Sequence, residues 1–192
     1  MKITVLRSNE ATTHLEPLAE ILRQSVEDGA LVGFVWPLSM ERATAYWEDT
    51  IQSVASGERL LLGAFVDDRL VGTVQLYLSP EPNAPHRAEV YKLLVHRDFQ
   101  RRGVGALLMM EVERQARQHQ RSLLLLDTVE GGASERLYRR LHWQEIGKVP
   151  HHFNDPYGVP KASVYMMKHL DLTADAIAPQ AEDQTAEVSA AG

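Results

Sequence analysis

The sequence predicts an α/β domain, because segments with the periodicity of a strand alternate along the chain with segments that have the periodicity of a helix. Apolar residues recur at helical spacing over residues 15–28. Two apolar runs, 59–66 and 70–78, flank a short polar turn and predict a β-hairpin. A third apolar run, 87–95, leads through a glycine-bearing turn into an amphipathic segment that predicts a helix over 103–119.

The other elements follow from the same patterns. Ser39 is expected to cap a helix that runs to about Val54, with Arg42 at the third helical position and therefore no capping box. Residues 79–86 hold three prolines and predict a loop. The full expected order is strand 2–7, helix 15–28, apolar loop 29–37, helix 39–54, strands 59–66, 70–78 and 87–95, helix 103–119, strand 122–128, helix 134–141, strand 144–149, loop 151–160 and strand 162–169.

Composition excludes several classes of function. The 192 residues suffice for one domain with a sizeable core, and the net charge of −6 predicts no nucleic-acid partner. The absence of cysteine excludes a disulfide framework, a thiolate metal site and a cysteine nucleophile. His151 and His152 are adjacent without a further ligand cluster, so no metal is expected. No run approaches the roughly 18 apolar residues of a membrane span, and the N-terminus lacks the apolar region of a signal peptide, so we expect a cytoplasmic protein with no membrane partner.

Residues 171–192 differ in character from the rest of the chain. They contain five acidic residues, no Lys or Arg and no aromatic residue, which predicts a disordered acidic tail after a folded domain of residues 1–170. Removing the five charges of the tail from the total leaves a domain with a net charge of about −1. The acidic balance of the whole chain therefore says little about the active part.

Gln100-Arg101-Arg102-Gly103-Val104-Gly105-Ala106 is the most informative stretch of the chain. Glycines between a strand and a helix expose backbone N–H groups at the positive end of the helix dipole, where a phosphate group is favoured. The spacing Gln-x-x-Gly-x-Gly differs from the dinucleotide fingerprint and from the Walker loop, and it points to the pyrophosphate of coenzyme A. The alternative is a glycine-containing helix start with two solvated arginines.

Three further residues are candidates for acid–base chemistry. A carboxylate can take a proton from a substrate, directly or through water. Glu89 lies in a largely apolar strand and Asp127 ends the apolar run 123–126. The alternatives are a buried ion pair for Glu89, such as one with Lys92, and a cap or turn role for Asp127.

Tyr138 is the candidate proton donor. Leu137 and Leu141 already supply an apolar face to the short helix, so we expect Tyr138 to point elsewhere; the alternative is a core aromatic residue with a satisfied hydroxyl. Ser134 lies four residues earlier on the same helical face and is expected near the cofactor. The apolar loop 29–37 belongs either to the core or to an acceptor pocket.

The order of elements, together with Leu93-Leu94-Val95, the glycine turn and Leu137-Tyr138, resembles the GCN5-related N-acetyltransferase (GNAT) family over roughly residues 2–170. The resemblance implies a mixed, mostly antiparallel twisted sheet of six to seven strands flanked by about four helices. It implies acetyl-CoA as co-substrate, with the pantetheine arm paired like an added strand along Leu94, Val95 and His96 and with a backbone N–H near Leu94 facing the thioester carbonyl. Direct transfer in a ternary complex is expected, and homodimers are common in the family.

A second resemblance, within that family, is to the tabtoxin-resistance acetyltransferases. It is carried by Arg87-Ala88-Glu89-Val90, Lys92-Leu93, Leu126-Asp127-Thr128 and Gly147-Lys148-Val149-Pro150. It implies Glu89 and Asp127 as a water-mediated base pair, Tyr138 as general acid, and a small amino-acid-like amine as acceptor, such as a tabtoxin-type toxin. The rival functions are acetylation of protein N-termini or lysines, and a non-catalytic acyl-CoA-binding module.

Overall fold

The computed structural model describes residues 1–173, so the expected tail beyond residue 173 lies outside the described part of the chain. Among the described residues, no helix is both long and apolar enough to span a membrane. The elements, in chain order, are β1 (Lys2–Leu6), α1 (Ser8–Thr13), α2 (Leu15–Glu27), α3 (Met40–Ala55), β2 (Arg59–Val66), β3 (Arg69–Leu78), β4 (Arg87–Val95), the 3₁₀ turn η1 (Arg97–Phe99), α4 (Val104–Gln118), β5 (Leu123–Val129), α5 (Ala133–Arg140), β6 (Gln144–Asn154) and β7 (Pro160–His169).

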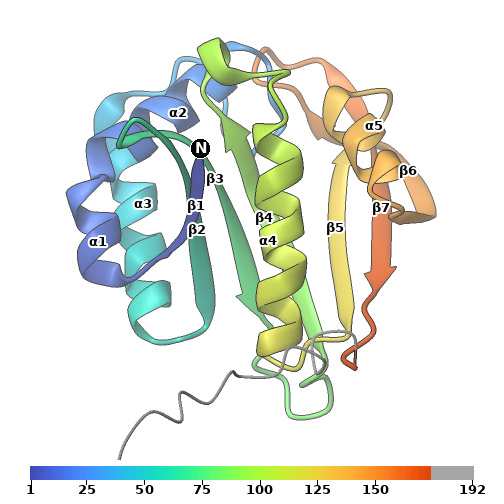
Figure 1. Ribbon diagram of the computed structural model, residues 1–192. Helices are drawn as coiled ribbons and strands as arrows, with labels where there is room; N and C mark the ends of the chain where they lie inside the picture. The colour runs from blue at the N-terminus through green and yellow to red at the C-terminus, as the bar shows by residue number, and fades with distance from the viewer. Residues whose placement is uncertain (174–192) are drawn as a thin grey trace, which may run out of the picture.

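The strands form one sheet in the order β1-β2-β3-β4-β5-β7-β6 (Figure 1). Within residues 1–173, five of the six neighbouring pairs are antiparallel, and β4 with β5 is the parallel pair. A parallel pair needs a crossover connection, and α4 supplies it. The expected mixed, mostly antiparallel α/β sheet is confirmed.

Helices cover both faces of the sheet (Figure 1). On one face α4 runs alongside the strands (Figure 1), and its buried residues Val104, Leu108 and Val112 belong to a core that also includes Tyr138 of α5. On the other face α1, α2 and α3 bury a second set, in which Leu22 and Trp47 are fully inaccessible. Helices on both sides thus exclude water from the centre of the sheet.

β4 changes its register with β3 near its carboxyl end. It pairs with β3 over Ala88–Tyr91 and again at residues 94–95, and Lys92 between these stretches has a φ of +51°. Such a bulge places an extra residue on one strand and bends it. β4 pairs with β5 only over Arg87–Glu89, opposite Leu123–Leu125. Beyond this short pairing the two strands share no ladder, and the edge of β4 that faces β5 is free.

The structure adds one helix that the sequence analysis missed, so the described residues hold five α-helices rather than about four. The segment of α1 is polar, and only Ala11 of its residues is buried, so no apolar periodicity marks it. The Arg7 N–H donates to the Glu10 carboxylate over 2.8 Å at its start. At α3 the expected cap is confirmed, because the Ser39 hydroxyl oxygen accepts a hydrogen bond from the Arg42 N–H.

The predicted loop 151–160 is wrong in extent. β6 continues to Asn154 and β7 begins at Pro160, so the connection is only residues 155–159. A register shift between Val149 and Phe153, with His151 at a φ of +51°, lets β6 resume pairing opposite Lys161. The sequence hides this continuation because the bulged segment is polar on an exposed edge strand.

Glu135, at the start of α5, carries a prediction about stability. Its side chain is 9% exposed, accepts a hydrogen bond from the Gly131 N–H over 2.6 Å and pairs with Arg139. Arg139, and then the Gly131 N–H, hold the pKa of Glu135 below its ordinary value of 4.5. We expect Glu135→Gln to lower the free energy of unfolding at pH 7 by about 1–3 kcal/mol.

The pH dependence of this effect follows from the sign of the shift. A carboxyl whose pKa is lowered by folding stabilises the protein above its unfolded pKa, and this stabilisation is lost as the pH falls through the folded pKa. Chemical denaturation at neutral and at strongly acidic pH should therefore show the difference between wild type and Glu135→Gln shrinking on acidification. Glu16→Gln, at an exposed first-turn position of α2, is the matched control. A difference that is the same at both pH values would contradict the assignment.

Candidate active site

The turn between β4 and α4 presents free backbone donors. Gly103 caps α4 with a φ of +83°, and the first helical hydrogen bond runs from the Leu107 N–H to the Gly103 carbonyl over 3.1 Å. The N–H groups of Val104, Gly105 and Ala106 therefore have no acceptor within the helix. No acidic residue lies in this first turn, so the positive end of the helix dipole is open to an anion.

The side chains of residues 100–102 anchor the turn to β4 and add positive charge to it. The Gln100 side-chain amide donates to the Val95 carbonyl over 3.2 Å, which ties the turn back to the end of β4. Arg101 has a φ of +59°, and Arg101 and Arg102 are both exposed at its rim. The Arg102 guanidinium lies 5.4 Å from the centre of the Phe99 ring. Two cations and several N–H donors thus surround one short turn.

His96, expected beside the cofactor, faces another way. The backbone N–H of His96 donates to the Val71 carbonyl of β3 over 2.9 Å, so this N–H cannot donate to an added strand. Its buried ring contacts Arg69 and Gln24, toward α2. Because donors alternate along an antiparallel strand, this bond places the N–H of Val95 on the side that faces β5. The preceding Leu94 is paired opposite Thr73 of β3, so Val95 is the better placed of the expected contacts.

Glu89 lies on β4 at the point where the pairing with β5 ends. Its carboxylate accepts a hydrogen bond from the Tyr91 hydroxyl and lies 3.9 Å from the Arg87 guanidinium. The partner considered in the sequence analysis, Lys92, is not the one found. The side chain is 31% exposed, so a third of it remains accessible to water or a ligand. Glu89 is therefore held by its neighbours and still reachable.

Asp127 lies within β5, in register with Tyr165 of β7, and not at a turn. Its side chain is exposed and accepts a hydrogen bond from the Ser163 hydroxyl over 3.4 Å. Its charge contributes to raising the pKa of Tyr91 and Tyr138, after the larger effect of burial. Asp127 is thus electrostatically linked to β4 and to α5, the two elements on either side of it.

The pattern of Leu137 and Leu141 predicted that Tyr138 points away from the core. In the structure it points into the core. It is 6% exposed and packs against Trp143, with ring centres 5.9 Å apart. Burial raises the pKa of its hydroxyl well above the ordinary value. The raised pKa keeps the hydroxyl protonated at neutral pH, and within the described residues it makes no hydrogen bond, so its O–H is available as a donor.

α5 approaches the cofactor turn through Leu137. A Cβ placed on Gly105 would lie 3.2 Å from Leu137 Cδ2, so the absence of a side chain at Gly105 lets the start of α4 and α5 pack closely. Ser134 is half-buried one turn before Tyr138. This contact places the helix that carries Tyr138 beside the helix start that carries the free N–H groups.

The sequence analysis missed a group of side chains on the face opposite α4, which belong to α3, β2, β3 and β4. Gln75 is fully buried and links the Tyr46 hydroxyl to the Arg59 guanidinium. Arg59 also stacks on Tyr77 and Tyr91, at 5.2 and 5.5 Å from the ring centres. The period-two pattern of polar residues in β3 and β4 was the available signal, because it places these side chains on one face of the sheet.

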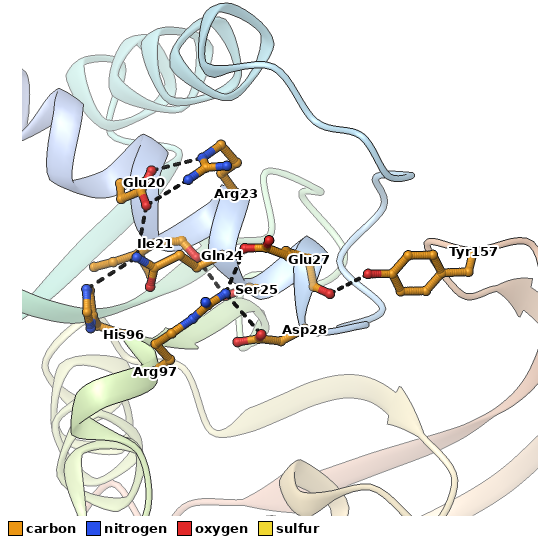
Figure 2. Close-up of polar contacts among 10 residues, drawn as sticks. All are labelled: Glu20, Ile21, Arg23, Gln24, Ser25, Glu27, Asp28, His96, Arg97 and Tyr157. Carbon is orange, nitrogen blue, oxygen red and sulfur yellow. Dashed lines mark hydrogen bonds and ion pairs between the residues drawn. The ribbon is translucent and has the colours of Figure 1, made fainter.

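Two loops close over the same face. The Trp36 N–H donates to the Pro156 carbonyl over 3.0 Å, which joins the connection between α2 and α3 to the turn between β6 and β7. The Tyr157 hydroxyl donates to the Glu27 carbonyl over 2.5 Å (Figure 2). Segments about 120 residues apart in sequence are thus bonded to each other at the edge of the candidate acceptor site.

The end of α2 also holds the segment that leads into the cofactor turn. Arg97 pairs with Glu27 and Asp28 over 2.8 and 3.0 Å, as Figure 2 shows. One helix end therefore contacts the β4–α4 connection on one side and, through Tyr157, the β6–β7 turn on the other (Figure 2). Within residues 1–173, no group of three or more metal-ligating side chains converges.

Comparison with known proteins gives a consistent result. A family model described as the acetyltransferase (GNAT) family matches residues 15–143. A ribosomal-protein-alanine N-acetyltransferase from Brucella melitensis superposes with a TM-score of 0.71 at 20% identity, covering 88% of this chain and 100% of its own. An N-acetyltransferase from Staphylococcus aureus gives 0.72 at 14% identity, with 89% and 98% coverage. A Salmonella typhimurium protein whose structure includes its cofactor acetyl-CoA gives 0.68 at 17% identity, with 94% and 98% coverage.

Proposed function

The chain belongs to the acetyltransferase (GNAT) family, and on this premise we propose that it transfers an acetyl group from acetyl-CoA to the amine of a small, amino-acid-like acceptor. The observation that carries the proposal is the free edge of β4 beyond Glu89, with the uncovered start of α4 at one end and two carboxylates, Glu89 and Asp127, near it. A pure binding module has no need of the carboxylates.

The free edge and the turn suit the chemical groups of coenzyme A. Its pyrophosphate would accept hydrogen bonds from the N–H groups of residues 104–106, with Arg101 and Arg102 adding positive charge at the rim. Its amide-rich arm would pair along the unpaired edge of β4, where Val95 presents its N–H. Acetyl-CoA supplies an acetyl group already activated as a thioester. The acetyl-CoA in the Salmonella typhimurium structure supports this choice of co-substrate.

The carboxylates and Tyr138 would divide the proton transfers between them. Glu89 and Asp127 attract the cationic amine and take its proton through water as the nitrogen bonds to the acetyl carbon. Tyr91 donates to Glu89 and so fixes its orientation. Tyr138, buried and protonated, holds the proton that the departing sulfur needs. No residue carries the acetyl group covalently in this scheme, in keeping with the absence of cysteine.

Tyr138→Phe tests the donor role. Removing the hydroxyl keeps the ring that packs on Trp143, so we expect kcat to fall about 10- to 100-fold while the Kd for acetyl-CoA stays nearly unchanged. Steady-state kinetics and calorimetric titration measure the two quantities. Tyr77→Phe, which removes the hydroxyl of a different tyrosine, on β3, is the control. Turnover equal to wild type would remove Tyr138 as the acid.

The contact between the two loops supports a small acceptor over a protein substrate. A protein N-terminus needs an open groove, and the bonds of Trp36 and Tyr157 bridge the loops that would border one. The Brucella melitensis neighbour, by its name, acts on an alanine of a ribosomal protein, so this rival belongs in the test.

A screen of acetyl-CoA consumption would decide the function. Free thiol release is followed with amino acids, amine antibiotics, a tabtoxin-type β-lactam and short peptides as acceptors. The proposal predicts turnover with an amino-acid-like amine. Turnover with peptides alone would favour the protein acetyltransferase, and tight acetyl-CoA binding without turnover on any amine would favour a binding module.

A further inference from the structure

Lys92 occupies the bulge of β4 and presents a cation that no carboxylate of the described residues pairs with. Its Nζ lies 5.4 Å from the centre of the Tyr46 ring and 3.9 Å from the position of a Cβ on Gly33, so it faces α3 and the loop before it. The side chain is half-buried. Across the described chain it makes no hydrogen bond or ion pair.

Arg59 is the second cation on this surface. Its guanidinium is bonded to the Gln75 amide oxygen and stacked on two tyrosine rings, so its position is fixed. Its Nε is buried without a hydrogen-bond partner, and no carboxylate of residues 1–173 lies within ion-pairing distance. Burial, and then the charge of Arg59, lower the pKa of Lys92, and the charge of Asp127 offsets this by a smaller amount, so the two cations act on each other.

Two partly buried cations without an ion-pair partner destabilise a fold, because each has lost water and each repels the other. The Tyr46 ring and the charge of Asp127 relieve Lys92 only in part, and no carboxylate of residues 1–173 forms an ion pair with either cation. Glu89 is held by Tyr91 and Arg87, and Asp127 accepts a hydrogen bond from Ser163. An anionic ligand group would supply the missing partner.

We propose that Lys92 and Arg59 form a subsite that binds a carboxylate of the acceptor. This inference rests on the proposed acetyltransferase function and narrows its substrate class to amines that carry a carboxylate. Lys92 would make the direct ion pair, and Arg59 would add positive charge behind it. A zwitterion fits the surface as a whole, because the cations lie toward α3 and the carboxylates Glu89 and Asp127 lie where β4 and β5 part.

The test compares free amino acids with their amides, using the twenty protein amino acids and the twenty amino acid amides as acceptors. For each pair, the ratio of kcat/KM for the acid to that for the amide is measured in the wild type and in Lys92→Met. Comparing ratios between proteins cancels the different basicity of the two amines. We expect the wild type to favour acids and Lys92→Met to lose about 10- to 100-fold of that ratio. Lys92→Arg, which keeps the charge, should lose less.

Lys148→Met is the matched control. Lys148 lies on the edge strand β6 and pairs with Glu130, so removing it also removes a lysine charge. The ratio of acid to amide in Lys148→Met should equal that of the wild type. Thermal unfolding checks that Lys92→Met is folded. An unchanged ratio in folded Lys92→Met, or a wild type that prefers amides, overturns the carboxylate subsite and leaves the acetyltransferase in place. Failure to acetylate any acid, amide or other amine overturns both proposals.

Discussion

Gly103→Val is expected to abolish measurable binding of acetyl-CoA, with a loss of at least about 100-fold in affinity. Two effects combine. The left-handed backbone at Gly103, with a φ of +83°, is strained for a β-branched residue and costs about 1–2 kcal/mol, so the turn tends to relax away from its geometry. A Cβ there meets no heavy atom within 4 Å, so the added side chain would extend into open space at the turn, where we propose that the pyrophosphate binds.

Gly57→Val separates these two effects. Gly57 also has a left-handed backbone, with a φ of +80°, and a Cβ there also meets nothing within 4 Å, but it follows α3 far along the chain from the turn. Both variants should lose similar free energy of unfolding, and only Gly103→Val should lose the coenzyme. Calorimetric titration with acetyl-CoA and chemical denaturation measure the two quantities. Equal affinities in Gly103→Val and the wild type would contradict the phosphate-binding role of the turn.

Asp127→Asn is expected to lower kcat by about 10²- to 10⁴-fold, the usual contribution of a positioned acid–base group. Asparagine keeps the shape and can still accept the hydrogen bond from Ser163, so only the charge and the basicity are lost. The change should also lower the pKa of Tyr138, because the Asp127 charge contributes to raising it. Acetyl-CoA affinity should be retained, since the residue lies outside the β4–α4 turn.

The design of this experiment distinguishes a shared proton path from two separate roles. If Glu89 and Asp127 act through the same water, Glu89→Gln added to Asp127→Asn should cost little beyond the single change, because coupled groups are not additive. Asp68→Asn, at an exposed position of the β2–β3 turn, is the control and should turn over normally. A kcat for Asp127→Asn within about threefold of the wild type would remove the carboxylate from the mechanism.

Local pattern was enough to predict most elements and the turn between β4 and α4. The β2–β3 hairpin, the Ser39 cap and the strand–turn–helix around Gly103 each depend on residues within a few positions of one another, and all three are present. α1 and the end of β6 were missed, because a polar helix and a bulged edge strand show no apolar periodicity.

The directions of the side chains around the proposed acceptor site could not be predicted from local pattern. Lys92 looked like a partner for Glu89 in sequence, yet the bulge turns it toward Tyr46 and gives Glu89 to Tyr91. Tyr138 looked free of the core because two leucines flank the same helix, yet Trp143 from the following turn packs on it. Both errors concern the direction of a side chain, which hydrophobic periodicity does not encode. For Lys92 the direction depends on the bulge, and for Tyr138 it depends on packing against Trp143.

The sequence by itself determined the α/β class, the order of its elements and a helix start suited to pyrophosphate, because hydrophobic periodicity and glycine placement act locally. Only the tertiary structure decided that β4 and β5 part after Glu89, that Lys92 and Arg59 share one surface without an ion-pair partner among residues 1–173, and that loops about 120 residues apart meet at Trp36 and Pro156. These features arise from contacts between strands and loops that are distant in the chain, and such contacts are fixed only when the whole sheet and its two cores form together.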